Sequence, residues 1–252
     1  MICKFCNRRI ADDSIFCAYC GEQLKPLPGQ NTMSNREVVF ADINLRSVLM
    51  NRFDADMNND GIITKKELAT LSKIELMGGD KVAQLEGLEY AVGLKEIIIR
   101  SCFSVQDISV LAKLKNLEHV WICNTNVRDL SPLAELENLR VLELRSNQID
   151  DIRPLANLKK LTLLDLSDNH VQDISAIAEM KELRDFAIRD NKVRDISVLE
   201  GLPNISDVDL SNNEVEDLSV FDRMAHPEHI TLKAKGNPLK NVPQAHLCEM
   251  KL

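Results

Sequence analysis

The chain has 252 residues, of which 44% are hydrophobic and only 4% aromatic, and it carries a net charge of -8 with a pI near 5.2. This acidic balance argues against a general binder of nucleic acids or of anionic membranes. No apolar run approaches the roughly 18 residues that a membrane-spanning helix requires, and an odd number of cysteines, seven, is typical of a reducing compartment. Since the N-terminus also lacks the apolar segment of a secretory signal, we expect a cytoplasmic protein.

The first predicted element is a zinc ribbon over residues 1–25. Two C-x-x-C pairs stand ten residues apart, and each pair can bind one edge of a tetrahedral zinc ion. Four thiolates leave no coordination position open for catalysis, and the ion would supply most of the folding energy because so short a segment cannot build an adequate core. The predicted ligands are Cys3, Cys6, Cys17 and Cys20. Residues 3–24 resemble the short N-terminal zinc-ribbon domains of bacterial proteins.

Two roles are open for this ribbon. Contact with nucleic acid would involve Lys4, Phe5, Arg8, Arg9 and Tyr19, but nearby acidic residues nearly cancel the positive charge, which favours a structural or protein-docking role. Residues 26–37 follow, and their richness in Pro, Asn and Ser without apolar periodicity predicts a flexible linker.

Residues 38–70 predict a helical cap built like an EF-hand. Asp42 is suited to N-cap a helix whose apolar residues recur at helical spacing from Leu45 to Phe53. Residues 56–67 then match the EF-hand calcium loop, with a glycine at its sharp turn. The predicted calcium ligands are Asp56, Asn58, Asp60, Ile62 through its carbonyl, Thr64 and Glu67.

A metal-free cap that keeps the shape of this loop is the alternative, because Ile63 and the exit helix through Leu68 lead straight into the first repeat. The loop also has no sister EF-hand, and cytoplasmic calcium is scarce. A bound ion would be either a constitutive staple or a weak sensor, and the sequence does not separate these roles.

The longest predicted element is a repeat array over residues 71–242, with seven full units and one partial unit. Corresponding apolar residues stand 22 residues apart at Leu117, Leu139, Leu161, Leu183 and Ile205. Each unit spaces its apolar residues three and then two apart, which suits a bend followed by a short strand and fits no sustained helical period. The pattern Leu-x-x-Leu-x-Leu-x-x-Asn is the signature of a leucine-rich repeat. We therefore predict an α/β solenoid with short parallel strands, whose units fold only when stacked.

Each unit carries two further signals. An asparagine follows the strand, where a buried amide can satisfy backbone groups that the turn leaves open. These residues are Asn147, Asn169, Asn191, Asn213 and Asn237. On the return limb, Ser131 before Pro132 is typical of an N-cap followed by proline at the first helical position, so we expect short helical turns on the convex side.

Alternate strand residues should point away from the core onto a concave sheet face. Trp121, the only tryptophan, lies on this face beside apolar residues and arginines, which is the composition of a protein-binding hot spot. The alternative is that exposed strand positions simply favour bulky residues. The predicted partner-binding residues are Ile98, Arg100, His119, Trp121, Val141, Glu143, Arg145, Leu163 and Asp165.

Cys123 falls in the same column of this face as Arg100 and Arg145, between them. Two neighbouring cations could lower the pKa of its thiol and make it reactive, but a cysteine in such a position is more often inert, and we expect an inert thiol. The other histidines, His170, His226, His229 and His246, are scattered over turns and the tail, and no paired carboxylates or phosphate-binding glycines occur, so we predict no catalytic residue.

The order of helix, loop and repeats from Val38 to Leu239 resembles bacterial proteins in which an EF-hand or dockerin-like segment precedes internalin-type leucine-rich repeats. The resemblance rests on the 22-residue period and on the Asn-x-Ile-x-Asp-Ile-Ser phrasing of the units. Residues 243–252 form a polar C-terminal tail, and Lys233 and Lys235 would guard the last edge of the sheet.

We predict a monomeric, non-enzymatic scaffold or adaptor that binds a protein partner on the concave face. Two other functions stay open. One is a calcium-responsive regulator, and the other is a nucleic-acid-associated factor that acts through the ribbon.

Overall fold

The computed structural model describes residues 36–243 and 249–251, together with Ile2, Arg8, Arg9, Cys17, Tyr19 and Cys20 near the N-terminus. Two predicted zinc ligands, Cys3 and Cys6, and residues 26–35 of the predicted linker lie outside the described residues. From residue 36 to residue 243 the described chain is continuous.

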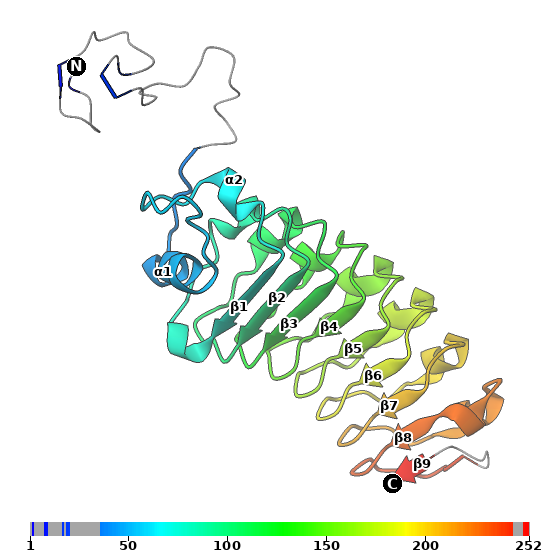
Figure 1. Cartoon of the computed structure of the whole chain (residues 1–252). Coiled ribbons are helices and arrows are strands. Elements are labelled where there is room, and N and C mark those ends of the chain that lie inside the picture. Colours follow the sequence, from blue (N-terminus) through cyan, green and yellow to red (C-terminus); the bar gives the residue numbers. More distant parts are fainter. Residues whose placement is uncertain are drawn as a thin grey trace.

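The repeats fold into one parallel sheet of nine strands, whose order in space is their order in the chain (Figure 1). The strands lie along one side of the array, and short 3-10 helices lie along the other. The strands are β1 Lys73–Met77, β2 Glu96–Arg100, β3 His119–Cys123, β4 Val141–Glu143, β5 Leu163–Asp165, β6 Asp185–Ala187, β7 Asp207–Asp209, β8 Thr231–Lys233 and β9 Glu249–Lys251. The predicted array of short parallel strands is confirmed.

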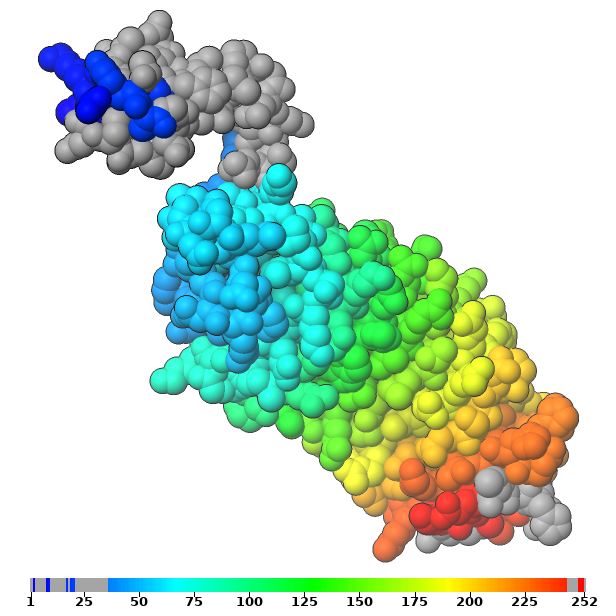
Figure 2. Space-filling view, viewed as in Figure 1, coloured from blue at the N-terminus to red at the C-terminus, as the bar shows by residue number. Residues whose placement is uncertain are grey.

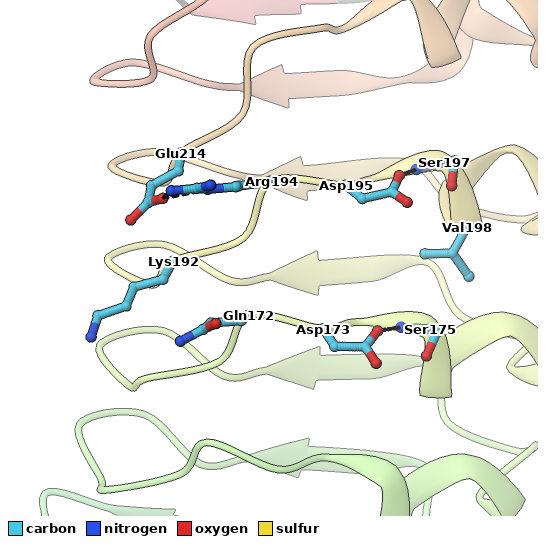
Figure 3. Close-up of a pocket in the computed structure, with 9 residues that line it drawn as sticks. All are labelled: Gln172, Asp173, Ser175, Lys192, Arg194, Asp195, Ser197, Val198 and Glu214. Carbon is cyan, nitrogen blue, oxygen red and sulfur yellow. Dashed lines mark hydrogen bonds and ion pairs between the residues drawn. The ribbon is translucent and has the colours of Figure 1, made fainter.

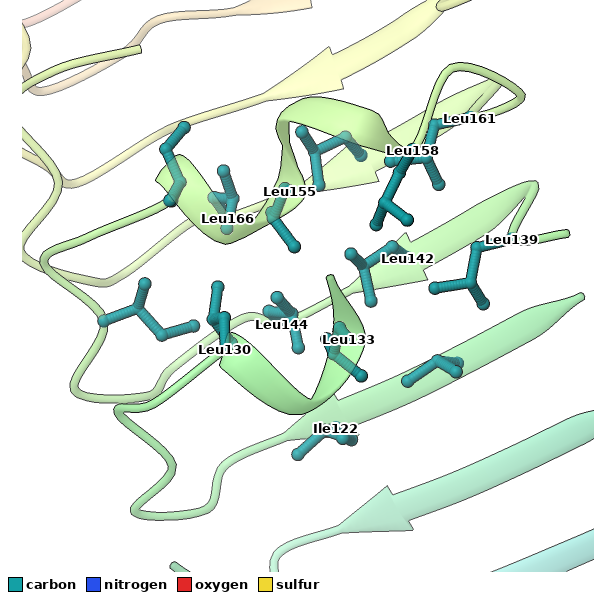
Figure 4. Close-up of a cluster of buried hydrophobic side chains, with 14 of the residues drawn as sticks. Ile122, Leu130, Leu133, Leu139, Leu142, Leu144, Leu155, Leu158, Leu161 and Leu166 are labelled. Carbon is teal, nitrogen blue, oxygen red and sulfur yellow. The ribbon is translucent and has the colours of Figure 1, made fainter. Parts of the chain in front are cut away.

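A single apolar core runs the length of the array. Leu142 of β4 and Leu144, just after this strand, point into the same layer as Leu130 and Leu133 of the return limb, and all four are at most 1% exposed (Figure 4). Burying one such side chain fully is worth about 1.5–3 kcal/mol. A unit reaches this burial only between its neighbours, and the space-filling view shows the units stacked in chain order (Figure 2).

The return limbs form 3-10 helices, and their caps differ from the prediction. Ser131 begins its helix instead of preceding it, and its N–H donates to Oδ1 of Asp129 at 2.8 Å. Ser197 makes the same bond to Asp195. The prediction of a serine N-cap is wrong, because the carboxylate two residues earlier accepts the N–H in an Asx-type turn. The helices are η1 Gly78–Asp80, η2 Leu88–Tyr90, η3 Ser109–Lys113, η4 Ser131–Leu133, η5 Arg153–Asn157, η6 Ser175–Glu179, η7 Ser197–Gly201, η8 Ser219–Arg223 and η9 Pro227–His229.

The predicted row of asparagines, one after the strand of each unit, is confirmed, and we call it the asparagine ladder. Nδ2 of Asn169 donates to the carbonyls of Leu144 and Leu166, both at 3.0 Å, and its Oδ1 accepts the N–H of Ile149 at 3.0 Å. Asn191 repeats this arrangement one unit later, and its Nδ2 also reaches the carbonyl of Leu166, at 2.9 Å. Each amide therefore ties two successive units together.

The residue before each ladder position has a left-handed backbone, which the sequence reading did not anticipate. Ser146, Asp168, Asp190 and Asn212 have φ between 55° and 58°, and Gly236 takes this place in the last unit with φ of 82°. Asn and Asp tolerate this conformation because their short polar side chains bond locally, and glycine has no Cβ to clash. The turn thus brings the next residue, the ladder asparagine, inward.

Two α-helices cap the first strand. Helix α1, Ile43–Arg52, begins after Asp42, whose carboxylate accepts the N–H of Asn44 at 2.8 Å and that of Ala83 at 2.6 Å. One side chain thus caps the helix and binds it to the first repeat. Helix α2, Lys65–Leu68, follows the loop of residues 53–64 and begins with a capping box between Thr64 and Glu67.

The far end of the sheet carries a strand that no feature of the sequence predicts. Strand β9 pairs in parallel with β8, so that Lys233 stands opposite Lys251. The expectation that Lys233 and Lys235 guard the last edge of the sheet is therefore wrong, because β9 covers the edge of β8. Among the helices of the described residues, none is long and apolar enough to cross a membrane.

Candidate functional site

The exposed face of the sheet presents columns of side chains in the predicted register. Trp121 of β3 stands opposite Ile98 of β2 on one side and opposite Glu143 of β4 on the other. In the adjacent column, Val141 stands between His119 and Leu163. Because neighbouring strands are about 4.8 Å apart, side chains in one column are in contact distance. We call this surface the sheet face.

Five residues form an apolar patch on the sheet face: Ile98, His119, Trp121, Val141 and Leu163. The rings of His119 and Trp121 are 5.6 Å apart between centroids and tilted by 46°. Ile98 is only 8% exposed because it lies against Trp121 and its own neighbours, whereas Trp121, Val141 and Leu163 are half-buried. Trp121 is thus fixed by packing on one side and open to a ligand on the other.

Charged residues surround this patch. Arg100 and Arg145 are exposed, and Glu143 and Asp165 are half-buried. Towards the C-terminal end the face becomes acidic through Asp185, Asp207 and Asp209. Burial, followed by the charge of Asp207, raises the pKa of Asp185. Like charges one strand apart repel one another, and Lys233 of β8 lies 3.5 Å from the carboxylate of Asp207.

The structure favours the inert Cys123 over the reactive alternative. Arg100 does stand opposite it in the sheet, but the thiol is only 9% exposed and its Sγ lies 3.8 Å from the carbonyl oxygen of Glu143. Burial raises the pKa of the Cys123 thiol, an effect that outweighs the lowering by Arg100. A buried thiol with a raised pKa is a poor nucleophile.

The loop predicted to bind calcium is shaped by its own side chains. Asp56 accepts the N–H groups of Asp60 at 3.1 Å and of Gly61 at 2.8 Å, and Asp60 accepts that of Ile62 at 2.9 Å. Gly61 has φ of 82°. Oε2 of Glu67 accepts hydrogen bonds from the backbone N–H of Thr64 at 2.8 Å and from the Thr64 hydroxyl at 2.6 Å. All the predicted ligand atoms of this loop are oxygens, and calcium prefers oxygen ligands.

Backbone pairing from outside the loop supports it. The N–H of Val38 donates to the carbonyl of Ile63 at 2.8 Å, and the N–H of Lys65 donates to the carbonyl of Arg36 at 3.1 Å. Residues 36–38 thus hold the end of this loop through backbone hydrogen bonds. Arg46 of α1 donates to the carbonyl of Gly61 at 2.6 Å.

Of the predicted zinc ligands, Cys17 and Cys20 are described. Cys17 is buried and Cys20 is exposed. The N–H of Tyr19 donates to Sγ of Cys17 at 3.4 Å, and the guanidinium of Arg8 lies over the Tyr19 ring at 5.0 Å. A backbone N–H aimed at sulfur fits a thiolate ligand, because such a bond stabilises the negative charge.

A surface hollow of about 530 Å³ lies on the flank of the array (Figure 3). Arg194 is paired with Glu214, and Asp173 and Asp195 are held by the N–H groups of serines two residues further on. The Asp–Ser contacts recur along the repeats as part of the fold, as at Asp107, Asp129 and Asp217, and the Arg194–Glu214 pair is exposed. The hollow therefore carries no separate chemistry.

The expectation that the histidines are scattered is wrong for two of them. His226 and His229 lie with their ring centroids 5.8 Å apart, and both approach the carboxylate of Glu228. In the described part of the chain, this is the one group of three or more His, Cys, Asp or Glu side chains whose possible metal-ligand atoms all lie within 4.8 Å of one another. The signal in the sequence is His226-Pro227-Glu228-His229, in which two histidines stand three residues apart around a glutamate.

Comparisons with known proteins agree with the repeat fold. The family described as Leucine Rich repeats (2 copies) matches residues 137–179. An internalin from Listeria monocytogenes is 28% identical with a TM-score of 0.73, over 81% of this chain and 59% of its own. An internalin C2 from the same organism is 23% identical with a TM-score of 0.74, over 85% of this chain and 94% of its own. A leucine-rich-repeat protein of Leptospira interrogans is 19% identical with a TM-score of 0.58, over 71% and 47%.

These likenesses concern the repeats. The chain spans 59% of the length of the first internalin. No curated protein matches the chain in sequence. The matching family is a structural repeat and not an enzyme family. The array is thus a leucine-rich-repeat solenoid with internalin-like structural neighbours.

Proposed function

We propose that this protein is a non-enzymatic scaffold that binds a protein partner on its sheet face. The observation that carries the proposal is the apolar patch around Trp121, which combines a large aromatic ring with a rigid strand backbone. Tryptophan and arginine are enriched in binding hot spots, and a tryptophan ring buries much surface at little entropic cost. Here Trp121 is also fixed in advance by the His119 ring and Ile98.

The surroundings of the patch define the partner's chemistry. Arg100 and Arg145 would form a polar rim that excludes water from an apolar anchor of the partner. The carboxylates of Glu143 and Asp165 lead from the patch to the acidic part of the face. A partner with an aromatic or aliphatic anchor next to basic side chains would suit both features.

A quantitative pull-down from source-cell lysate tests the proposal. We would compare the intact protein with the variant Trp121→Ala/Arg145→Glu and with the control Phe103→Ala/Arg128→Glu. The control removes an exposed aromatic ring and inverts an exposed arginine away from the patch. We expect a partner that the intact protein and the control retain and the sheet-face variant loses. If all three proteins retain the same partners, the sheet face is not the binding surface.

A second proposal is that calcium binds the loop and stabilises the cap. Its support is the set of oxygen donors and the backbone pairing of Ile63. At a calcium concentration of 100 times the Kd, binding would stabilise the folded state by about 2.7 kcal/mol. We expect calcium to raise the unfolding temperature of the intact protein and of the control Asp54→Asn, but not of Asp56→Asn. Equal shifts in all three would leave the metal-free cap as the correct description.

We also propose that Cys3, Cys6, Cys17 and Cys20 hold a structural zinc ion in a reducing, cytoplasmic setting. The support is the spacing of the two pairs and the N–H directed at Cys17. Zinc content measured on the purified chain should fall by one ion per molecule in Cys17→Ser. Cell fractionation would test the location, and salt-dependent retention on DNA or RNA would instead favour a nucleic-acid role for the ribbon.

A further inference from the structure

The last full repeat departs from the pattern at residues 226–229. Strand β8 follows β7 at an interval of 24 residues, as Asp207 pairs with Thr231, whereas β5, β6 and β7 follow one another at 22. His229 occupies the position that earlier units fill with a buried Leu or Ile, such as Ile205. Its side chain is 72% exposed, and Ile230 takes its place in the core at 1% exposure.

The insertion coincides with the three-residue helix η9, Pro227–His229, which is separated from β8 by Ile230 alone. In a 3-10 helix the side chains at i and i+3 lie one above the other, so His226 and His229 share one face. Pro227 at the first turn fixes the backbone between them. Nothing in the packing of the repeats requires either histidine, since both are exposed.

The two distances to the Glu228 carboxylate fit a metal centre, and the ligand atoms of all three side chains lie within 4.8 Å of one another. Nδ1 of His226 lies 3.2 Å from Oε1 of Glu228, and Nε2 of His229 lies 3.6 Å from the same oxygen. Ligand atoms of a tetrahedral zinc ion with bonds of 2.0–2.1 Å are about 3.3 Å apart. Two imidazoles and a carboxylate suit borderline divalent ions such as zinc better than calcium or magnesium, which prefer oxygen ligands only.

We propose that His226, Glu228 and His229 bind a divalent transition-metal ion of the zinc class at the C-terminal end of the array. Three protein ligands leave a fourth position for water or for a group from another molecule. Both histidines also line a surface hollow of about 540 Å³, together with Lys181 and Arg184. These cations would favour an anionic fourth ligand, such as a carboxylate.

The competing description is a surface ion pair in which Glu228 bonds to protonated histidines. Exposed pairs of this kind contribute little to stability, and they would show no preference for a metal. Zinc titration of the full chain separates the two descriptions. We would measure bound zinc by equilibrium dialysis in the intact protein, His226→Ala, His229→Ala and the control His170→Ala, which removes an exposed histidine from another turn.

The cysteines are the same in all four proteins, so a zinc ion bound at the N-terminus cancels in the comparison. We expect the intact protein and His170→Ala to bind one more zinc ion than the other two variants, or to bind that ion at least about tenfold more tightly. Each variant changes an exposed residue, so all four should unfold at the same temperature in the presence of a chelator. Equal zinc content and affinity in all four proteins would overturn the proposal.

Discussion

Replacement of Asn169 by alanine tests the asparagine ladder, which holds the repeats together. The side chain is 5% exposed, and its amide bonds to Leu144, Leu166 and Ile149. Both carbonyls keep a second amide partner, from Asn147 and Asn191. The N–H of Ile149 loses the side-chain oxygen that satisfies it. An orphaned buried N–H costs about 1–3 kcal/mol, and two weakened carbonyl bonds add roughly 0.5–1 kcal/mol each, so we expect a loss of about 3 kcal/mol.

Urea unfolding followed by circular dichroism would measure this loss. The matched control is Asn116→Ala, whose exposed amide donates to the carbonyl of Val92 at 2.8 Å and whose removal should cost less than about 1 kcal/mol. Hydrogen exchange of the Ile149 amide should also accelerate in Asn169→Ala, because its acceptor is gone. If both variants unfold at the same urea concentration, the ladder amides do not stabilise the array in the way described.

Three further changes test other parts of the fold. The pKa of Asp195 is lowered, so its contribution to stability is complete above its ordinary value near pH 4 and is lost as the pH falls through the lowered value; Asp195→Asn should therefore flatten the acid side of a plot of unfolding temperature against pH. The pKa of Asp185 is raised by burial, so the cost of its charge appears as the pH rises from about 4 through the raised value, and Asp185→Asn should unfold at a higher temperature at pH 7 but not at pH 3. In Gly93→Ala the new Cβ would lie 2.2 Å from the carbonyl oxygen of Ala69, which should lower stability by about 1–3 kcal/mol in urea unfolding, whereas Gly79→Ala meets no atom within 4 Å and should change little.

The sequence predicts the repeating parts of the structure because every unit carries the same spacing of apolar residues and the same asparagine position. The spacing of Leu139, Leu142 and Leu144 fixes which strand residues face the core, and this in turn fixes the register that places Ile98 beside Trp121. The ladder follows from the same repetition, since a buried amide at one position in every unit has few other uses.

The sequence does not predict the parts of the structure where the repetition ends. It also does not predict properties, such as the pKa of a thiol, that depend on how deeply one residue is buried. Strand β9 has three exposed residues without alternation, so it has no strand signal. The cluster at His226 depends on a two-residue insertion that turns His229 outward. Cys123 has the expected arginine beside it, but the depth of its thiol in the sheet, which sets its pKa, follows only from three-dimensional packing.

The central proposal for this protein is that a protein partner docks on the sheet face. Site-specific photo-cross-linking tests it most directly, with a photoreactive amino acid placed at Val141 or Leu163 on the sheet face, or at Arg153 on the opposite side of the array. We expect the partner recovered by the pull-down to cross-link from positions 141 and 163 and not from 153. Cross-links from 153 alone would contradict the claim and move the binding surface to the return limbs.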